Sequence, residues 1–269
     1  MTRITARRRH PLARYAVLLF ALALVGGVYT LLSPASRPAD AALASGKADD
    51  VAEGKSLFQA HCSSCHGLNA EGTSTGPTLV GVGAAAVDFQ VSSGRMPAAN
   101  PGAQAPRKPV APWVNEDTTR QLAAYVQSLG GGPVVPDKNA VDPAQGNVAR
   151  GGELFRANCI QCHNWTGAGG ALTLGKYAPN LNEATPTQIY EAMATGPQAM
   201  PVFNDSTITP EEKRDMIAYI TDVREQTDPG GFGLGRIGPV TEGLVAWLVG
   251  ISALVLAAIW ITAKKRQAS

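Results

Sequence analysis

The chain places all four of its cysteines in two copies of the pattern Cys-x-x-Cys-His. The copies are Cys62 and Cys65 followed by His66, and Cys159 and Cys162 followed by His163. This pattern is the attachment site of a c-type haem, in which the two thiols add to the two vinyl groups of one porphyrin. A spacing of three on a helix puts both sulfurs on one face, and the adjacent histidine then reaches the iron. The sequence therefore predicts two covalently bound haem c groups.

Two other kinds of site use a Cys-x-x-Cys pair. A thioredoxin-like redox pair does not require the histidine that follows each motif here. A zinc ribbon brings two pairs together, but it rarely separates them by the long interval between Cys65 and Cys159. The sequence favours haem over both alternatives.

An internal repeat surrounds the two motifs. Gly54 to Phe58, before the first motif, matches Gly151 to Phe155, before the second, at the same offset that separates Cys62 from Cys159. Each repeat has about 80 to 90 residues, which is small for a hydrophobic core without a cofactor. The chain is therefore predicted to contain two haem domains, each completed by the apolar bulk of its porphyrin.

Apolar periodicity and turn residues predict three main helices in each repeat. They cover residues 50–60, 84–93 and 117–129 in the first repeat and residues 146–157, 186–195 and 210–224 in the second. The closing helices show the clearest spacing, with Leu122 and Val126 in one and Met216 and Ile220 in the other.

With these elements both repeats resemble class I cytochrome c domains, in which an N-terminal helix bearing the haem motif packs against a C-terminal helix. The resemblance covers nearly all of both repeats and implies an all-α fold. In that family a proline carbonyl after the motif receives the second ring nitrogen of the histidine that ligates the iron. The matching residues are Pro77 for His66 and Pro179 for His163. Such a contact orients the imidazole and tunes the metal.

The same family supplies the sixth iron ligand from a methionine in a loop, usually followed by proline. In the first repeat Met96, in a Met-Pro pair, matches this pattern. The second repeat offers Met193, which keeps the repeat offset but lies in a predicted helix, and Met200, in a Met-Pro pair after the predicted helix cap Gly196. We expect Met96 and Met200 as ligands, with Met193 as the alternative. An iron held by histidine and methionine has no open position, so neither haem is expected to be catalytic.

Two apolar segments flank the repeats. Residues 15–36 and 243–263 carry no charged side chain, and either is long enough for the roughly 20 residues of a membrane-spanning helix. Basic side chains precede the first segment and follow the second, which predicts both termini in the cytoplasm and the haem domains outside the cell membrane. For the first segment a cleaved signal peptide is the alternative, because small-residue cleavage sites occur at residues 39–44.

These signals predict tandem class I cytochrome c domains between an N-terminal and a C-terminal transmembrane helix. The expected segments are a basic tail with the first transmembrane helix or signal peptide (1–36), a linker (37–50), cytochrome c domain 1 (51–131), a linker (132–145), cytochrome c domain 2 (146–227), a glycine-rich hinge (228–242), the second transmembrane helix (243–263) and a basic cytoplasmic tail (264–269).

Charge and loop length add two further observations. Eight of the 23 Lys and Arg residues lie in the two terminal segments, so the part between them is acidic, with all 21 Asp and Glu. This suits a basic redox partner, although a solvated surface is the commoner explanation, and it does not indicate nucleic-acid binding. A proline-rich stretch, residues 97–112, lengthens the loop after Met96 relative to the second repeat. It is interpreted as a surface insertion or as a docking edge beside the first haem.

The order of anchor, two haem repeats, hinge and final span resembles the cytochrome c subunits of actinobacterial cytochrome bc1 complexes, the menaquinol-cytochrome c reductases. This resemblance implies a cytochrome b subunit, a Rieske iron-sulfur subunit and an aa3-type cytochrome c oxidase as partners, with the chain relaying electrons between the last two. The alternatives are the dihaem subunit of a cbb3-type oxidase, which offers no match for a C-terminal span, and a dihaem peroxidase, which needs an accessible iron.

Overall fold

The computed structural model describes residues 11–32, 48–102, 104–226 and 239–267. Two units divide the chain: Met1–Ser45, which contains helix α2 (Pro11–Leu32), and Gly46–Ser269, which contains the other elements. The expected hinge up to residue 238, most of the linker at residues 37–50 and the cleavage sites at residues 39–44 lie outside the described residues.

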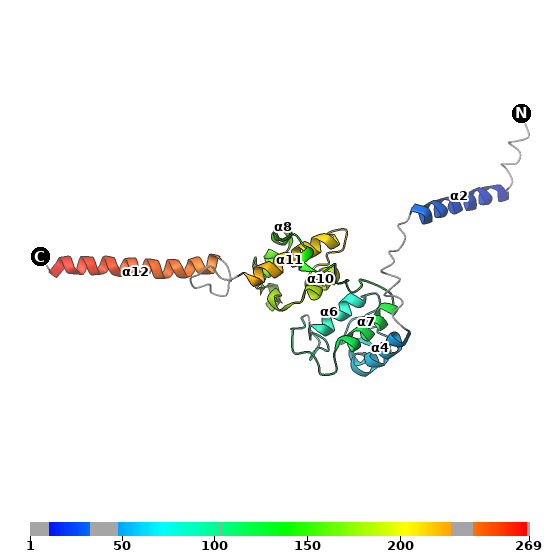
Figure 1. Ribbon diagram of the computed structural model, residues 1–269, viewed down its shortest axis with the longest axis horizontal. Coiled ribbons are helices and arrows are strands. Elements are labelled where there is room, and N and C mark those ends of the chain that lie inside the picture. The colour runs from blue at the N-terminus through cyan, green and yellow to red at the C-terminus, as the bar shows by residue number, and fades with distance from the viewer. Residues whose placement is uncertain (1–10, 33–47, 103, 227–238, 268–269) are drawn as a thin grey trace, which may run out of the picture. The chain divides into compact units, whose positions relative to one another are not determined.

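Three helices frame each repeat, and Figure 1 shows them as two neighbouring groups. They are α4 (Ala48–His61), α6 (Ala84–Ser92) and α7 (Glu116–Ser128) in the first repeat and α8 (Val148–Asn158), α10 (Pro186–Thr195) and α11 (Pro210–Glu225) in the second. A single turn carries the end of each motif, α5 (Ser63–His66) and α9 (Ile160–His163). All six predicted helices are confirmed, with ends that differ by at most two residues.

Side chains fix where these helices begin and end. Asn115, Thr185 and Thr209 form capping boxes at the starts of α7, α10 and α11, which satisfies backbone N–H groups that have no partner inside a helix. Helix α10 ends at Gly196, whose φ of 58° lies in the left-handed region that glycine adopts without strain. The predicted cap at Gly196 is confirmed, and it sets the start of the turn that contains Met200.

The first and last helices of each repeat pack together at a glycine. A Cβ on Gly54 of α4 would lie 2.0 Å from the carbonyl oxygen of Gln121 on α7. A Cβ on Gly151 of α8 would lie 1.9 Å from the carbonyl oxygen of Asp215 on α11. Both distances are far below van der Waals contact, so the two helix pairs approach this closely only because the glycines have no side chain.

One helical turn further along, an aromatic pair seals each crossing. Phe58 packs on Tyr125, and Phe155 packs on Tyr219, with 5.3 Å between the ring centroids in both pairs. Both phenylalanines are buried, each in the core cluster of its own repeat. The repeated segment found in the sequence is thus the repeated contact between two helices.

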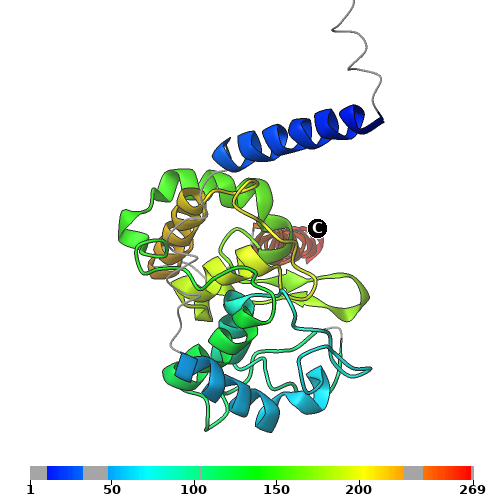
Figure 2. The same cartoon turned by 90° about the vertical axis from the view of Figure 1, so that its right-hand side faces the viewer.

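A short hairpin in the second repeat was not predicted. Strands β1 (Gly170–Ala171) and β2 (Tyr177–Ala178) pair antiparallel, with Gly170 opposite Ala178 (Figure 2). The hairpin lies between the haem motif and Pro179, where the second repeat is longer than the first. Two residues per strand are too few to show the alternating pattern by which a strand is recognised.

The two repeats contact each other through α6 and α10, which lie side by side (Figures 1 and 2). Gln188 of α10 donates from Nε2 to Ser92 Oγ of α6 at 3.0 Å. Thr185 at the start of α10 holds the same glutamine backbone through its hydroxyl, so the contact begins at a fixed helix end. Helix α6 therefore packs against α7 of its own repeat and also against α10 of the second repeat.

Helix α12 (Pro239–Gln267) contains the apolar run Gly243–Ala263, whose 21 residues are long enough to cross a membrane. Its side chains from Leu244 to Ala263 are exposed, so no core of the described residues buries them. Among the side chains of α2 that the structure describes, the apolar run is Tyr15–Gly27. By length and composition, one span is found among the described residues.

Candidate functional site

Both haem motifs sit on helical turns that continue from the preceding helix. Cys62 donates its backbone N–H to the Phe58 carbonyl at 2.8 Å, and Cys159 donates to the Phe155 carbonyl at the same distance. The N–H of His66 then donates to the Cys62 carbonyl at 3.0 Å, with the matching bond from His163 at 2.9 Å. The buried phenylalanine in each core therefore fixes the direction of the motif that follows it.

The two motif histidines are buried and each is held by a proline carbonyl. His66 Nδ1 lies 2.8 Å from the Pro77 oxygen, and His163 Nδ1 lies 3.2 Å from the Pro179 oxygen. A carbonyl only accepts hydrogen bonds, so Nδ1 donates in both rings and Nε2 keeps its lone pair. Burial lowers the pKa of His163, with a smaller opposing effect from the bond to Pro179. The His163 ring is therefore a neutral imidazole with Nε2 available to a metal.

No disulfide joins the cysteines of either motif. Burial, and then the neighbouring cysteine of the same motif, raise the pKa of Cys62 and of Cys159 to about 11. Redox-active Cys-x-x-Cys pairs lower a thiol pKa to stabilise the thiolate, and the pKa values of Cys62 and Cys159 move in the opposite direction. Within the ranges that the structure describes, no group of three His, Cys, Asp or Glu side chains is placed to hold a metal ion. The raised thiol pKa values count against the dithiol alternative.

A cavity of about 350 Å³ lies beside the second motif. Cys159, Cys162 and His163 line it from one side, and apolar residues such as Ile189 and Ile220 line much of the rest. Two thiols, an imidazole with an available Nε2 and an apolar wall are the groups that a covalently attached porphyrin requires. The residues present therefore fit haem c.

The structure brings both candidate methionines of the second repeat to this cavity. Met193 on α10 is 3% exposed and belongs to the core cluster of the repeat. Met200 lies after Gly196 and is only partly buried against the same cluster. Both residues line the cavity together with His163, so the choice between them stays open on geometry. In the first repeat Met96 lies beyond α6, packed against the core cluster that contains Phe58.

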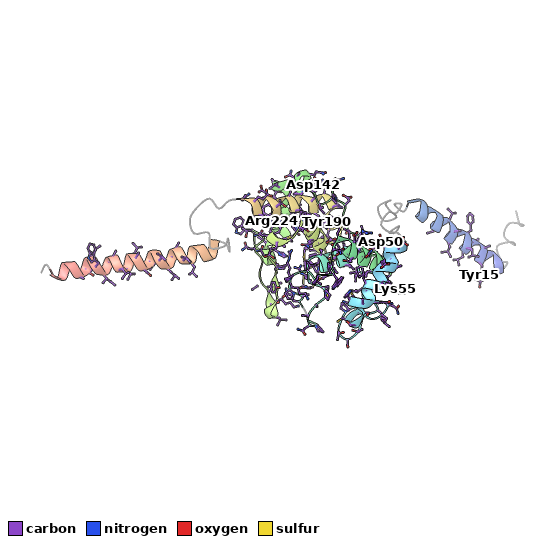
Figure 3. The ribbon with its side chains drawn as sticks, turned by 60° about the horizontal axis from the view of Figure 1, so that its bottom comes forward. Tyr15, Asp50, Lys55, Asp142, Tyr190 and Arg224 are labelled. Carbon is purple, nitrogen blue, oxygen red and sulfur yellow. The ribbon has the colours of Figure 1, made fainter. Side chains whose placement is uncertain are left out.

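Pro179 is held in place by the segment that follows it. Arg224, labelled in Figure 3, lies near the end of α11. It donates from Nη2 to the Leu181 carbonyl at 2.9 Å and to the Ala184 carbonyl at 3.0 Å. These bonds join the loop after Pro179 to the closing helix. The closing helix thus fixes both sides of the cavity, through its glycine crossing with α8 and through this loop.

The proline-rich loop of the first repeat contacts the second repeat. Gln104 donates to the Tyr177 carbonyl and accepts from the Tyr177 N–H, Arg107 donates to the Glu183 carbonyl, and Gln198 donates to the Ala105 carbonyl. Together with Phe89 and Arg95, residues Gln104 and Arg107 also line the cavity beside His163. Neither interpretation of this loop included such a contact. The sequence signal for this contact was a pair of length differences. The first repeat is longer at this loop, and the second repeat is longer at the hairpin.

Comparisons with known proteins agree with the two-repeat architecture. A family model described as cytochrome c matches residues 51–130, and one described as cytochrome c oxidase, cbb3-type, subunit III matches residues 146–220. Both repeats therefore match cytochrome c-type domains.

Relatives with the same name match over nearly the whole chain. The cytochrome bc1 complex cytochrome c subunit of Corynebacterium diphtheriae is 45% identical over 279 residues, which cover 96% of this chain and 97% of the relative. The subunit of the same name from Mycobacterium tuberculosis is 46% identical and covers 97% of this chain and 94% of the relative. The cbb3-type cytochrome c oxidase subunit FixP of Sinorhizobium medicae is 32% identical, over 29% of this chain and 30% of the relative.

Proposed function

The chain belongs to the family of cytochrome c subunits of the cytochrome bc1 complex, and from this membership we propose that it is a membrane-anchored carrier with two haems. Family membership supports covalently bound haem c and electron transfer within a quinol-oxidising reductase. The observation that carries the proposal of a bound haem is the cavity beside His163. Two thiols, an oriented imidazole and a methionine thioether meet there.

Each residue of the two sites has a definite task in this proposal. Cys62 and Cys65 attach one haem, and Cys159 and Cys162 attach the other. The motif histidines, His66 and His163, would bind the two irons through Nε2, because their Nδ1 atoms donate to Pro77 and Pro179. Met96 and Met200 would each supply the second protein ligand to an iron. Haem c, when bound, supplies an iron that accepts and releases one electron at a time.

Two haems follow from the equivalence of the two motifs. Each motif continues from a helix with a buried phenylalanine, and each histidine is held by a proline carbonyl at a corresponding place. A histidine and a methionine at each iron would leave no coordination site for a substrate. The task of the chain is then to carry electrons between partners, and the reductase chemistry belongs to the complex.

The proposed partners are a cytochrome b subunit, a Rieske iron-sulfur subunit that donates electrons, and an aa3-type cytochrome c oxidase that accepts them. Helix α12 serves as the membrane anchor, supported by the exposed apolar run Gly243–Ala263. Basic residues after this run favour a cytoplasmic C-terminus and place the haem domains on the outer side of the membrane.

The extent of the matches separates this proposal from the alternatives. Similarity to the cbb3-type subunit FixP covers 29% of the chain, whereas similarity to bc1 cytochrome c subunits covers 96%. A partial match of this size is what any shared cytochrome c domain produces, so it supports the fold rather than the complex. A peroxidase is disfavoured because a methionine is available for the distal position of each iron.

Purification of the tagged full-length chain from its native membrane tests the proposal. We expect cytochrome b and Rieske subunits to co-purify, and the haem assay of the denatured chain to give two covalent haems. As a matched control, the double variant Cys159→Ala and Cys162→Ala should lower the haem content from two to one. Co-purification with the catalytic subunit of a cbb3-type oxidase, or one haem in the unmodified chain, would contradict the proposal.

A further inference from the structure

The cavity beside His163 draws its wall from both repeats. The second repeat supplies the apolar part, including Phe155, Ile189 and Ile220. The first repeat supplies Phe89, Arg95, Gln104 and Arg107. The haem site of the second repeat is therefore closed by residues of the first.

The first repeat also supplies the positive charge of the cavity wall. Among the described residues that line this cavity, the positively charged side chains are Arg95 and Arg107. Both come from the first repeat. Haem c carries two propionates, which are negatively charged at neutral pH. A carboxylate next to an apolar wall is costly unless a cation or hydrogen-bond donors pair with it. The second repeat contributes no cation to the described cavity wall for that purpose.

Arg95 is held in the wall with its charge unpaired by any carboxylate. Its side chain is 9% exposed, and its guanidinium carbon lies 4.8 Å from the centre of the Phe89 ring. Among the described residues, neither Arg95 nor Arg107 takes part in an ion pair with Asp or Glu. Burial, and then the charge of Arg107, lower the pKa of Arg95. Two cations that repel each other at the edge of a cavity are stabilised when an anion lies between them.

Arg107 is positioned by the loop that carries it. Its Nη1 donates to the Glu183 carbonyl at 2.6 Å, which leaves the other guanidinium nitrogens available. On the same loop, Gln104 exchanges two hydrogen bonds with the backbone of Tyr177 on β2, and Ala105 accepts from Gln198 at 3.0 Å. The two segments by which the repeats differ in length, the proline-rich loop and the hairpin, thus bind each other. This contact preorganises the guanidinium group toward the cavity.

We propose that Arg95 and Arg107 of the first cytochrome c domain bind the propionates of the haem in the second domain. The proposal rests on the proposed function, because it requires a haem in the second domain. Arginine pairs with carboxylates through two parallel hydrogen bonds, which suits a propionate better than a lysine does. Arg95 immediately precedes Met96, so one short segment serves the axial position of the first iron and the propionates of the second haem.

The proposal predicts a change in one redox potential. A ferric haem carries one more positive charge than a ferrous haem, so nearby cations favour the reduced form. Replacing Arg95 or Arg107 by glutamine removes a cation and should make reduction of the second haem about tenfold less favourable, which is 59 mV for a one-electron couple. The potential of the second haem should fall, and the equilibrium constant for reduction of the first haem should change by less than a few-fold.

Spectroelectrochemical titration of the full-length chain measures both potentials in Arg95→Gln, Arg107→Gln and the double variant. Arg107→Lys keeps the charge and should restore most of the potential. Arg120→Gln is the matched control, because Arg120 is an exposed arginine of the first domain that pairs with Asp50 and Asp117. It should leave both potentials unchanged.

Gln104→Ala separates charge from loop position. This variant loses both bonds to Tyr177 but keeps the two cations, so the potential of the second haem should change much less than in Arg107→Gln. An equal change in the two variants would mean that loop closure, and not charge, sets the potential, and would overturn the proposal. An unchanged second potential in the double variant would also overturn it.

Haem content, measured first in every sample, keeps the two proposals distinguishable. If the double variant carries two haems per chain and the potential of its second haem is unaltered, the arginine proposal is contradicted but the proposed function is not. A single haem in the unmodified chain contradicts the proposed function itself.

Discussion

At the scale of single residues, the proximal histidines show how a backbone carbonyl sets metal chemistry. Pro77 and Pro179 have carbonyl oxygens that only accept, so each ring nitrogen facing them must donate. That choice of tautomer leaves Nε2 of His66 and of His163 with a lone pair. A proline restricts this segment, because its ring locks φ and so removes one of the two backbone rotations that orient the carbonyl.

The sixth ligand of the second haem is also decided by single residues. We expect Met200→Leu to lower the midpoint potential of the second haem, because loss of the thioether removes a ligand that raises it. The same variant should bind carbon monoxide rapidly when reduced, since one axial position is then open. Met96→Leu should lower the midpoint potential of the first haem and open that haem to carbon monoxide. The potential of the second haem should stay near its original value. Redox titration and carbon monoxide binding measure these effects.

Met193→Leu is the matched control for this prediction. Met193 is almost fully buried on α10, so leucine should cost less than about 1.5 kcal/mol of stability and leave the potential unchanged. If instead Met193→Leu lowers the second potential and Met200→Leu does not, Met193 is the ligand.

At the scale of elements, the glycine crossings hold each repeat together. In Gly54→Ala the new Cβ would meet the Gln121 carbonyl at 2.0 Å, so α4 and α7 must move apart. Overpacking of this kind costs about 1–3 kcal/mol, which exceeds the gain of about 1 kcal/mol in helix propensity. We expect thermal unfolding of the haem-loaded chain, followed by haem absorbance, to occur at a lower temperature.

Ser56→Ala is the control on the same helix, since Ser56 is exposed and lies away from the crossing. It should leave the unfolding temperature nearly unchanged. Equal stability of Gly54→Ala and the unmodified chain would mean that the helices adjust without cost.

The contact between α6 and α10 contains a buried acid. Glu191 is 0% exposed, and neither of its carboxyl oxygens has a hydrogen-bond partner. Burial, and then the charge of Asp88 on α6, raise its pKa from 4.5 to about 9. Burial also raises the pKa of Asp88, with a smaller effect from Glu116, while a hydrogen bond with Ser92 lowers it. At neutral pH the Glu191 side chain is therefore a neutral carboxylic acid.

This acid makes stability depend on pH. Between pH 4.5 and about 9 the unfolded chain releases a proton that the folded chain retains, so the free energy of unfolding falls as pH rises. Below pH 4.5 both states are protonated and the contribution is fully present. We expect Glu191→Gln to flatten this decrease, as measured by chemical denaturation across the range.

Glu153→Gln is the control for this prediction, because Glu153 is exposed on α8. It should leave the slope of stability against pH unchanged. A slope in Glu191→Gln equal to that of the unmodified chain would show that another group produces the decrease.

At the scale of the whole molecule, membrane attachment depends on segments outside the two repeats. Helix α12 contains a run long enough to span a bilayer, and the described side chains of α2 include the apolar run Tyr15–Gly27. If the first segment is retained as a span, a chain truncated after Gln226 should stay in the membrane through it. Extraction at alkaline pH measures this, with sequencing of the mature N-terminus as the control. Release of the truncated chain would indicate that the first segment is a cleaved signal peptide.

The two repeats also differ from a pair of independent domains. The proline-rich loop of the first repeat and the hairpin of the second bind each other through Gln104 and Tyr177. Helices α6 and α10 add a second contact, which buries Glu191. The second cavity is therefore assembled from both repeats, and a second repeat on its own would lack part of its wall.

The sequence by itself determined the features that depend on neighbours along the chain. Motif spacing predicted the position of each Cys-x-x-Cys-His turn, and glycine predicted the cap at Gly196. Apolar periodicity predicted the two closing helices, and turn residues helped to delimit the other four main helices. Hydropathy predicted the apolar run in α12. These signals are local, because a helix repeats its hydrogen bonds every few residues and a membrane span needs only length and composition.

Only the tertiary structure decided which distant residues meet. It placed Arg95 and Arg107 on the cavity of the other repeat, brought Met193 and Met200 to the same wall, and buried Glu191 against α6. No local pattern marks these positions, since an arginine in a proline-rich loop has the same neighbours along the chain whether it faces water or a second domain. Contacts between domains depend on packing shape, which emerges only when both folded surfaces are present.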